Sequence, residues 1–192
     1  MDETREALEF DVLFVGGGPA NLAGAIHLMN MAQKAGKEIE VCLIEKAESI
    51  GSHSLSGAIL DPVALQELIP DFLEKGCPIE RSECRDEFYY LTRNKAWAAP
   101  MTPRYMHNTG CYVISASRLS RWLGGIAEEM GVNIFPGFAG VETLFSDDGK
   151  TVTGVRTGDK GLEAVVAKLR EHGKKDIKLY GNALFDHTDP WL

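Results

Sequence analysis

The sequence has 192 residues, of which 44% are apolar and 25% are charged, and 28 acidic against 20 basic side chains give a net charge of −8. This balance excludes nucleic acid as a natural partner and disfavours purely electrostatic binding to anionic lipid. The composition and length are those of one folded domain with room for an appendage, and the absence of an 18-residue apolar run predicts no membrane-spanning helix.

The sequence predicts neither a targeting segment nor a metal or redox site. Residues 1–10 are acidic and lack an apolar stretch, so they predict neither a secretory signal nor an Arg-rich transit peptide. The four cysteines, Cys42, Cys77, Cys84 and Cys111, contain no C-x-x-C pair, which argues against zinc, an iron–sulfur cluster or a redox dithiol. We therefore expect reduced thiols and no metal site in this chain.

A strand, a glycine turn, a helix and a second strand follow one another near the start of the chain. Residues 10–15 (FDVLFV) are a short run of strand formers that stops at the glycine-rich stretch 16–21 (GGGPAN). Apolar residues then recur with helical spacing, and Pro19 and Gly36 suit the beginning and the end of a helix. Residues 39–44 are a second apolar run, so the sequence predicts a βαβ unit.

The acid directly after the second strand makes this unit typical of dinucleotide binding. Gly16 permits a tight turn, Gly18 lets the backbone approach a pyrophosphate, and a helix that begins near Pro19 offers N–H groups and a positive dipole end. Glu45 would accept hydrogen bonds from the hydroxyls of the adenosine ribose. These residues leave NAD and FAD open, whereas the acid argues against the additional phosphate of NADP.

One position departs from the glycine pattern. Asn21 stands where a third glycine normally allows close packing of the helix on the strand. Gly24 lies one helical turn further along and can supply that close approach. We therefore expect the substitution to be tolerated.

The stretch after the acid resembles the electron transfer flavoprotein–ubiquinone oxidoreductase family. Residues 45–62 (EKAESIGSHSLSGAILDP) match the family's E-K, its G-[AS]-H-[ST]-L-S-G-A and its L-D-P motifs. The match begins at the glycine turn, is most specific over the first sixty residues and covers roughly four fifths of the chain. The other matching segments are residues 70–72, 74–78, 91–92, 106–113, 121–124, 131–139 and 157–159.

This resemblance implies an α/β fold, a partial Rossmann-like FAD-binding domain, with FAD bound in an extended form. It places the pyrophosphate on residues 16–21, the ribose on Glu45, the flavin beside residues 53–57 and the adenine near residues 137–139. The cofactor-binding residues expected on this basis are Gly16, Gly17, Gly18, Pro19, Ala20, Asn21, Glu45, Lys46, His53, Ser54, Leu55, Ser56, Gly57, Phe138 and Ala139.

The expected flavin loop also has an ordinary interpretation. Ser54 and Ser56 offer donors without bulk, as a flat, polar-edged ring needs, but a Ser- and Gly-rich surface loop has the same composition. A lone histidine such as His53 is most often a structural hydrogen-bonding residue. We expect no catalytic residue here, because in flavin electron transfer the cofactor carries the chemistry.

Residues 60–73 are an apolar segment with two open interpretations. Asp61–Pro62 predicts the start of a short helix. Its apolar side chains cover a broader arc than one buried stripe needs. The resemblance implies that this region dips into one leaflet of a membrane, in which case replacing Leu68 and Phe72 with Ser should abolish liposome binding. The ordinary alternative is a helix buried under the sheet.

The middle of the chain predicts short strands, a helix and a hairpin. Residues 79–112 mix strand-like runs with prolines and indicate a small inserted β element. Helical spacing marks residues 119–130, and a strand is expected at residues 132–135. The runs 141–145 and 151–155 flank a turn sequence and predict a β-hairpin.

The end of the chain diverges from the family. Residues 162–173 predict an amphipathic helix and residues 176–180 a strand, while residues 185–192 look irregular. We assign residues 1–158 to the FAD-binding domain and residues 159–192 to a divergent tail. The family's returning strand, quinone-binding domain and cysteine-rich iron–sulfur site are not found, so we expect only the front part of the enzyme.

By resemblance, the chain is expected to be the FAD-binding part of an oxidoreductase that passes electrons from electron transfer flavoprotein to ubiquinone. One alternative is a split or truncated module that needs a second chain to complete the FAD site. Another is a related flavin-dependent reductase or hydroxylase with a different electron partner. The expected location is the cytoplasm with peripheral contact at the inner membrane, or the mitochondrial inner membrane in a eukaryote.

Overall fold

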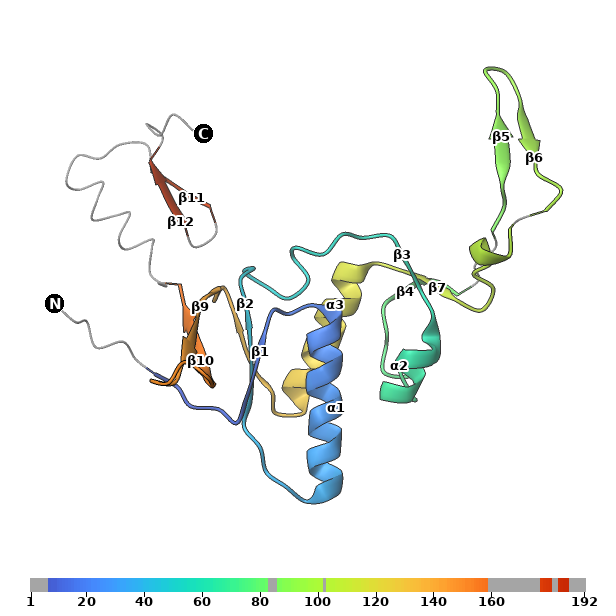
Figure 1. Ribbon diagram of the computed structural model, residues 1–192. Helices are drawn as coiled ribbons and strands as arrows, with labels where there is room; N and C mark the ends of the chain where they lie inside the picture. Colours follow the sequence, from blue (N-terminus) through green and yellow to red (C-terminus); the bar gives the residue numbers. More distant parts are fainter. Residues whose placement is uncertain (1–6, 83–85, 102, 159–176, 181–182, 187–192) are drawn as a thin grey trace.

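A parallel three-stranded sheet forms the centre of the chain (Figure 1). The computed structural model describes residues 7–82, 86–101, 103–158, 177–180 and 183–186. In the sheet, β2 (Val41–Glu45) lies between β1 (Val12–Val15) and β8 (Asn133–Pro136). The first four residues of β2 are buried, as expected for the central strand of the sheet.

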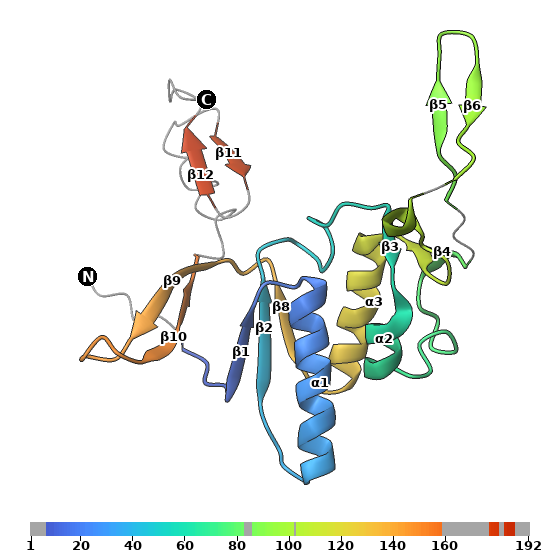
Figure 2. The same ribbon diagram turned by 45° about the vertical axis from the view of Figure 1, so that its right-hand side comes forward.

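Helices cover one face of this sheet (Figure 2). The predicted first helix is confirmed as α1 (Pro19–Ala35), which ends at Gly36 with a left-handed φ of +62°. α3 (Ala116–Glu129) packs against α1, and its first turn is capped by the Ser115 hydroxyl. The core between the helices and the sheet is built from Leu22, Ala25, Ile26, Val41, Leu43, Leu119, Leu123 and Ala127.

The predicted inserted β element, residues 79–112, contributes strands to two separate sheets. β3 (Ala58–Leu60), β7 (Tyr112–Ile114) and β4 (Ile79–Arg81) form an antiparallel sheet with β7 in the middle. β5 (Tyr89–Leu91) and β6 (Ala96–Ala98) form a hairpin that projects away from the rest of the chain (Figure 2). A short 3-10 helix, Arg104–Met106, leads from this hairpin back to β7.

The apolar segment 60–73 is largely part of the core. It contains α2 (Pro62–Leu68), which begins with the Asp61 carboxylate accepting a hydrogen bond from the Val63 amide. The side chain of Phe72 is only 2% exposed and packs edge-on against Tyr112. Of the two open interpretations, the structure supports burial for Phe72, because this ring, like Leu65 and Ile69, is covered by the chain itself. Within the described residues, no helix is long and apolar enough to cross a membrane.

Two hairpins follow the central sheet. β9 (Gly140–Phe145) and β10 (Val152–Thr157) confirm the predicted hairpin. β11 (Ile177–Tyr180) confirms the predicted strand in the tail and pairs with β12 (Ala183–Asp186). The expectation of irregular structure is wrong for Phe185 and Asp186, which pair with β11 in a register that extends through all four residues of β12. The helix expected at 162–173 lies outside the described residues.

Candidate functional site

Three loops meet at the carboxyl edge of the parallel sheet. The Gly16 amide, at the end of β1, donates to the Ile44 carbonyl at 2.7 Å. The Phe138 amide, just after β8, donates to the Glu45 carbonyl at 2.8 Å. Because the strands are parallel, the glycine turn, the acid and residues 137–139 all lie at one edge (Figure 2). This is the edge at which open α/β sheets bind their ligands.

The glycine turn leaves room and hydrogen-bond donors beside it. Gly16 has a φ of +104°, a conformation that favours glycine. Gly18 directly precedes α1, and no atom lies within 4 Å of the position that a Cβ on Gly18 would occupy. Among the described residues, none accepts a hydrogen bond from the amides of Gly18 or Ala20. An anion can therefore approach the positive end of α1 at this point.

Glu45 turns towards the glycine turn. Its Oε2 accepts a hydrogen bond from the Gly17 amide at 2.5 Å, and its Oε1 accepts one from the Ala47 amide at 2.8 Å. The carboxylate thus lies at the site, and two backbone bonds fix its orientation. The Gly17 amide is engaged by this acid, which leaves the next amides of the turn for a phosphate.

Ile50 is a residue of this site that the sequence did not reveal. Its side chain is buried between the glycine turn and α3, where a Cβ on Gly17 would lie 2.3 Å from the Ile50 Cδ1. On the other side, a Cβ on Gly124 of α3 would lie 3.4 Å from the Ile50 Cγ2. Ile50 stands in a loop without hydrophobic periodicity, so no pattern marks it. The small residue at position 124, which leaves room for the Ile50 side chain, is a signal in the sequence that is consistent with this packing.

The side chain of Asn21 also contacts the turn. Its Nδ2 donates to the Val15 carbonyl and to the Gly16 carbonyl, both at 2.9 Å. The close approach expected from Gly24 is confirmed, because a Cβ there would lie 3.3 Å from the Cε1 atom of Phe14.

The expected flavin loop follows Gly51 across the same edge. Gly51 is buried against the Ser117 carbonyl of α3, and the Ser54 amide donates to the Gly51 carbonyl at 3.1 Å. The side chains of His53, Ser56 and Lys46 are exposed, and that of Leu55 is 89% exposed. The loop is therefore anchored at one end and presents its remaining side chains to solvent.

The backbone expected near adenine is partly engaged within the chain. The Gly137 amide donates to the Ala47 carbonyl at 2.7 Å, and the Ala139 carbonyl accepts from the Gly158 amide at 2.8 Å. The rings of Phe138 and Phe135 meet edge to face, 5.9 Å apart. These contacts hold residues 137–139 close to the end of β2.

Two of the three cysteines that the structure describes have thiols of low reactivity. Cys42 and Cys77 are buried, and burial raises the pKa of each thiol to about 11, so both are protonated at neutral pH. Cys84 lies outside the described residues. Within the described part of the chain, no three or more His, Cys, Asp or Glu side chains are grouped to hold a metal ion.

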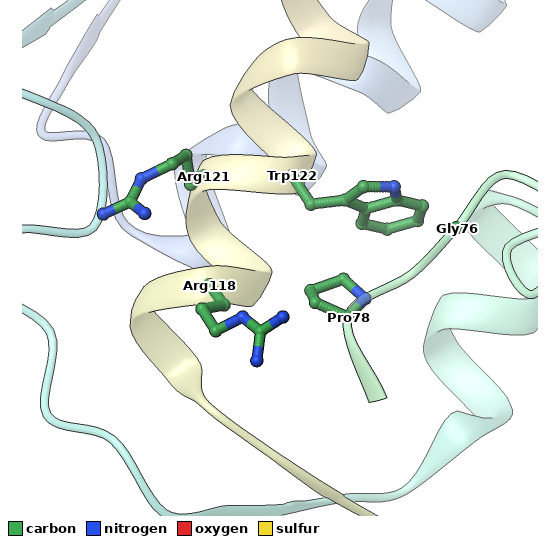
Figure 3. Close-up of a pocket in the computed structure, with 5 residues that line it drawn as sticks. All are labelled: Gly76, Pro78, Arg118, Arg121 and Trp122. Carbon is green, nitrogen blue, oxygen red and sulfur yellow. The ribbon is translucent and has the colours of Figure 1, made fainter. Parts of the chain in front are cut away.

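A shallow pocket of about 230 Å³ lies between α3 and the segment that follows α2 (Figure 3). Trp122 and Pro78 lie next to each other in it, and Arg118 and Arg121 of α3 also line it. The Arg118 guanidinium pairs with Glu80 at 2.5 Å, and the Trp122 indole N–H donates to the Lys75 carbonyl at 3.0 Å. The polar groups of Arg118 and Trp122 are thus engaged within the chain, and we assign the pocket no ligand.

Exposed apolar side chains gather on the β5–β6 hairpin. Tyr90, Leu91 and Trp97 are each at least 60% exposed, and Phe88 and Met101 at its base are exposed as well. Neither face of either strand is buried. The hairpin thus has no core of its own in the described structure.

Comparison with known proteins confirms the resemblance stated above. The chain is 49% identical over 158 residues to the mitochondrial electron transfer flavoprotein-ubiquinone oxidoreductase of Dictyostelium discoideum, a match that covers 82% of this chain and 26% of that protein. It is 47% identical over 162 residues to a probable electron transfer flavoprotein-ubiquinone oxidoreductase of Acinetobacter baylyi, with 82% and 28% coverage. The chain therefore spans about a quarter of the length of these relatives. No family model matches the chain.

Solved structures confirm the fold class. A geranylgeranyl bacteriochlorophyll reductase-like protein from Thermoplasma acidophilum aligns with a TM-score of 0.52 at 17% identity, over 79% of this chain and 35% of that chain. The FAD-dependent halogenase CndH, a myxobacterial protein, aligns with a TM-score of 0.53 at 20% identity, over 79% and 33%. The chain has a partial Rossmann-like fold of the kind found in FAD-dependent enzymes.

Proposed function

We propose that this chain forms the FAD-binding part of a flavoprotein oxidoreductase that passes electrons from electron transfer flavoprotein to ubiquinone. The observation that carries the proposal is the meeting of the glycine turn, Glu45 and residues 137–139 at one edge of a parallel sheet. That geometry suits an extended dinucleotide. The similarity to electron transfer flavoprotein-ubiquinone oxidoreductases favours FAD over NAD.

The residues at this edge fit the separate parts of FAD. The amides of Gly18 and Ala20 would bind the pyrophosphate at the positive end of α1. The Glu45 carboxylate, already oriented by the Gly17 and Ala47 amides, would accept from a ribose hydroxyl. The backbone of Phe138 and Ala139 would lie beside the adenine.

The loop after Gly51 would lie beside the flavin, with the side chains of His53, Ser54, Leu55 and Ser56 and the backbone of Gly57 along it. Most of these side chains are solvent-exposed, so a planar ring can approach them. The flavin, when bound, supplies the electron-transfer chemistry. The chain's own residues bind and orient it, and we assign none of them an acid or base role.

Absorption spectra of the purified chain with and without FAD test this proposal, and Gly18→Val is the decisive variant. Gly18 has an ordinary φ of −78° and open space beside it, so valine fits the fold while filling the position proposed for the pyrophosphate. We expect FAD affinity to fall at least about 100-fold with little change in thermal stability. Gly125→Ala, at another open position on α3, is the control that should leave FAD affinity unchanged.

The same experiment separates the alternatives. Equal FAD binding by the original chain and the Gly18→Val variant would contradict the proposed site. A chain that takes up FAD only with a second polypeptide would be a split module. Reduction of the bound flavin by NADPH and not by reduced electron transfer flavoprotein would instead indicate a related reductase.

We further propose that the β5–β6 hairpin, in place of segment 60–73, makes the peripheral membrane contact. The hairpin exposes Tyr90, Leu91 and Trp97, whereas the buried side chains of segment 60–73 are unavailable to lipid. Tyrosine and tryptophan favour the boundary between lipid headgroups and acyl chains, and binding there scales with buried apolar area.

Flotation with neutral phosphatidylcholine vesicles tests this assignment. The double variant Leu91→Ser and Trp97→Ser should lose vesicle binding. The matched variant Val63→Ser and Leu73→Ser, which changes exposed residues of segment 60–73, should keep it. If only the Val63→Ser and Leu73→Ser variant lost vesicle binding, the contact would be assigned to segment 60–73. If the original chain did not bind vesicles either, the proposal of membrane contact would be wrong.

A further inference from the structure

Asn21 replaces the third glycine of the usual dinucleotide-binding pattern, and its side chain hydrogen-bonds to the glycine turn. The Nδ2 group donates at 2.9 Å to the carbonyls of Val15 and Gly16. These two consecutive carbonyls lie where the chain leaves β1 and enters the turn. One amide group from α1 thus bridges the end of the strand and the start of the turn.

The turn needs such support because its first residue is not in a strand conformation. Gly16 has a φ of +104°, so the regular ladder between β1 and β2 ends there, after the hydrogen bond from its amide to Ile44. A glycine in this region is free to adopt many other conformations in an unrestrained chain. A donor that binds two consecutive carbonyls restricts that freedom.

The turn is held from two other sides as well. The Gly17 amide donates to Glu45, and the Ile50 side chain fills the space directly beside Gly17. Residues 15–17 are therefore fixed by a side-chain amide, a carboxylate and a packed aliphatic group. The next amides, of Gly18 and Ala20, remain available for a ligand.

We propose that Asn21 is a positioning residue that holds the turn in its pyrophosphate-binding conformation before the nucleotide arrives. This inference rests on the proposed function. Because the turn is already ordered, binding loses less conformational freedom than it would with a flexible turn. The packing role usually given to a third glycine is met by Gly24 against Phe14, so residue 21 is free to carry a side chain.

Three substitutions at position 21 distinguish this role from simple tolerance, with ADP and FAD as probes. Asn21→Ala removes the donor and should weaken binding of both probes about tenfold. Asn21→Gly restores the usual pattern without the donor and should weaken both to a similar degree. Asn21→Asp has the same shape but brings a carboxylate against two carbonyls and the phosphates, so it should weaken both about 100-fold. Original affinity in Asn21→Gly and Asn21→Ala would overturn the proposal.

Amide hydrogen exchange without nucleotide gives a readout that does not depend on FAD binding. The Gly16 and Gly17 amides should exchange about tenfold faster in Asn21→Ala than in the original chain, with amides of β2 unchanged as the internal control. Unchanged exchange at Gly16 and Gly17 would refute the positioning role. If the original chain bound neither probe, the proposed function would fail, while the exchange result would still decide the role of Asn21.

Discussion

Apolar side chains are buried in the central sheet and its helices, whereas they are exposed on the β5–β6 hairpin. In the centre, Leu22, Leu43 and Phe72 are almost fully covered by neighbours. On the hairpin, the aromatic rings of Tyr90 and Trp97 are exposed to solvent. The difference shows that hydrophobic content alone does not identify a core, because burial needs a second surface to pack against.

The two regions also contribute differently to the stability of the chain. Burial of apolar area stabilises the centre, whereas an isolated two-stranded hairpin is at best marginally stable. Substitutions should therefore have large effects on stability in the centre and small ones on the hairpin.

Phe72→Ala and Tyr90→Ala form the strongest test of this contrast. We expect Phe72→Ala to destabilise the chain by about 3–5 kcal/mol, because it leaves a cavity beside Tyr112. Tyr90→Ala should change the free energy of unfolding by less than about 0.5 kcal/mol. Urea unfolding followed by circular dichroism measures both, and similar losses in the two variants would contradict the comparison.

Gly51→Ala tests whether a loop can be as tightly packed as the centre. A Cβ at this position would lie 2.3 Å from the Ser117 carbonyl oxygen, and the φ of +81° disfavours alanine. Steric overlap and backbone strain together should cost about 3 kcal/mol. Gly36→Ala is the matched control, because it shares the left-handed φ but has open space around it and should cost only about 1 kcal/mol. Equal losses in thermal unfolding would mean that strain alone determines the effect.

A stabilising change is expected on the solvent side of α3. Gly125 lies within the helix with nothing within 4 Å of its Cβ position, so Gly125→Ala should stabilise the chain by about 0.5–1 kcal/mol. Gly124→Ala should gain less, because its methyl group would contact Ile50 at 3.4 Å. If Gly124→Ala raised the free energy of unfolding more than Gly125→Ala in the same urea assay, the position of Ile50 beside Gly124 would be contradicted.

The smallest expected effect is the pH dependence of a hydrogen-bonded carboxylate, that of Asp86, at the base of the β5–β6 hairpin. Hydrogen bonds from the Asn108 side chain and then from its backbone amide lower the pKa of the Asp86 carboxyl. The contribution of these bonds is therefore fully present above the unfolded pKa of about 3.9 and is lost as the pH falls through the lower folded value. The Asn108 amide resonance should shift over this acidic range while those of β2 stay constant. In Asp86→Asn that shift should disappear, and a shift that persists would assign the titration to another group.

The sequence predicted the βαβ unit and the carboxyl edge because these features are local. A strand, a turn that requires glycine, a periodic helix and an acid follow one another along the chain, and Gly36 ends α1 as expected. Glu45 and the turn come together because parallel strands place their ends at one edge.

The remaining features depend on contacts between distant residues. β3 and β7 are three-residue strands from separate parts of the chain, and neither has a pattern that names its partner. Ile50 stands in a loop, so its place between Gly17 and Gly124 follows from packing alone. For Phe72, the apolar arc was visible, but an arc does not show whether protein or lipid covers it.

The order of strands in the central sheet also bears on how the chain folds. Leu13 pairs with Cys42 about 30 positions away, whereas Cys42 pairs with Asn133 about 90 positions away. Closing the longer loop costs about 1 kcal/mol more in chain entropy. The β1–α1–β2 unit should therefore form before β8 pairs with β2. During synthesis, the glycine turn and Glu45 would then come together before β8 completes the carboxyl edge of the sheet.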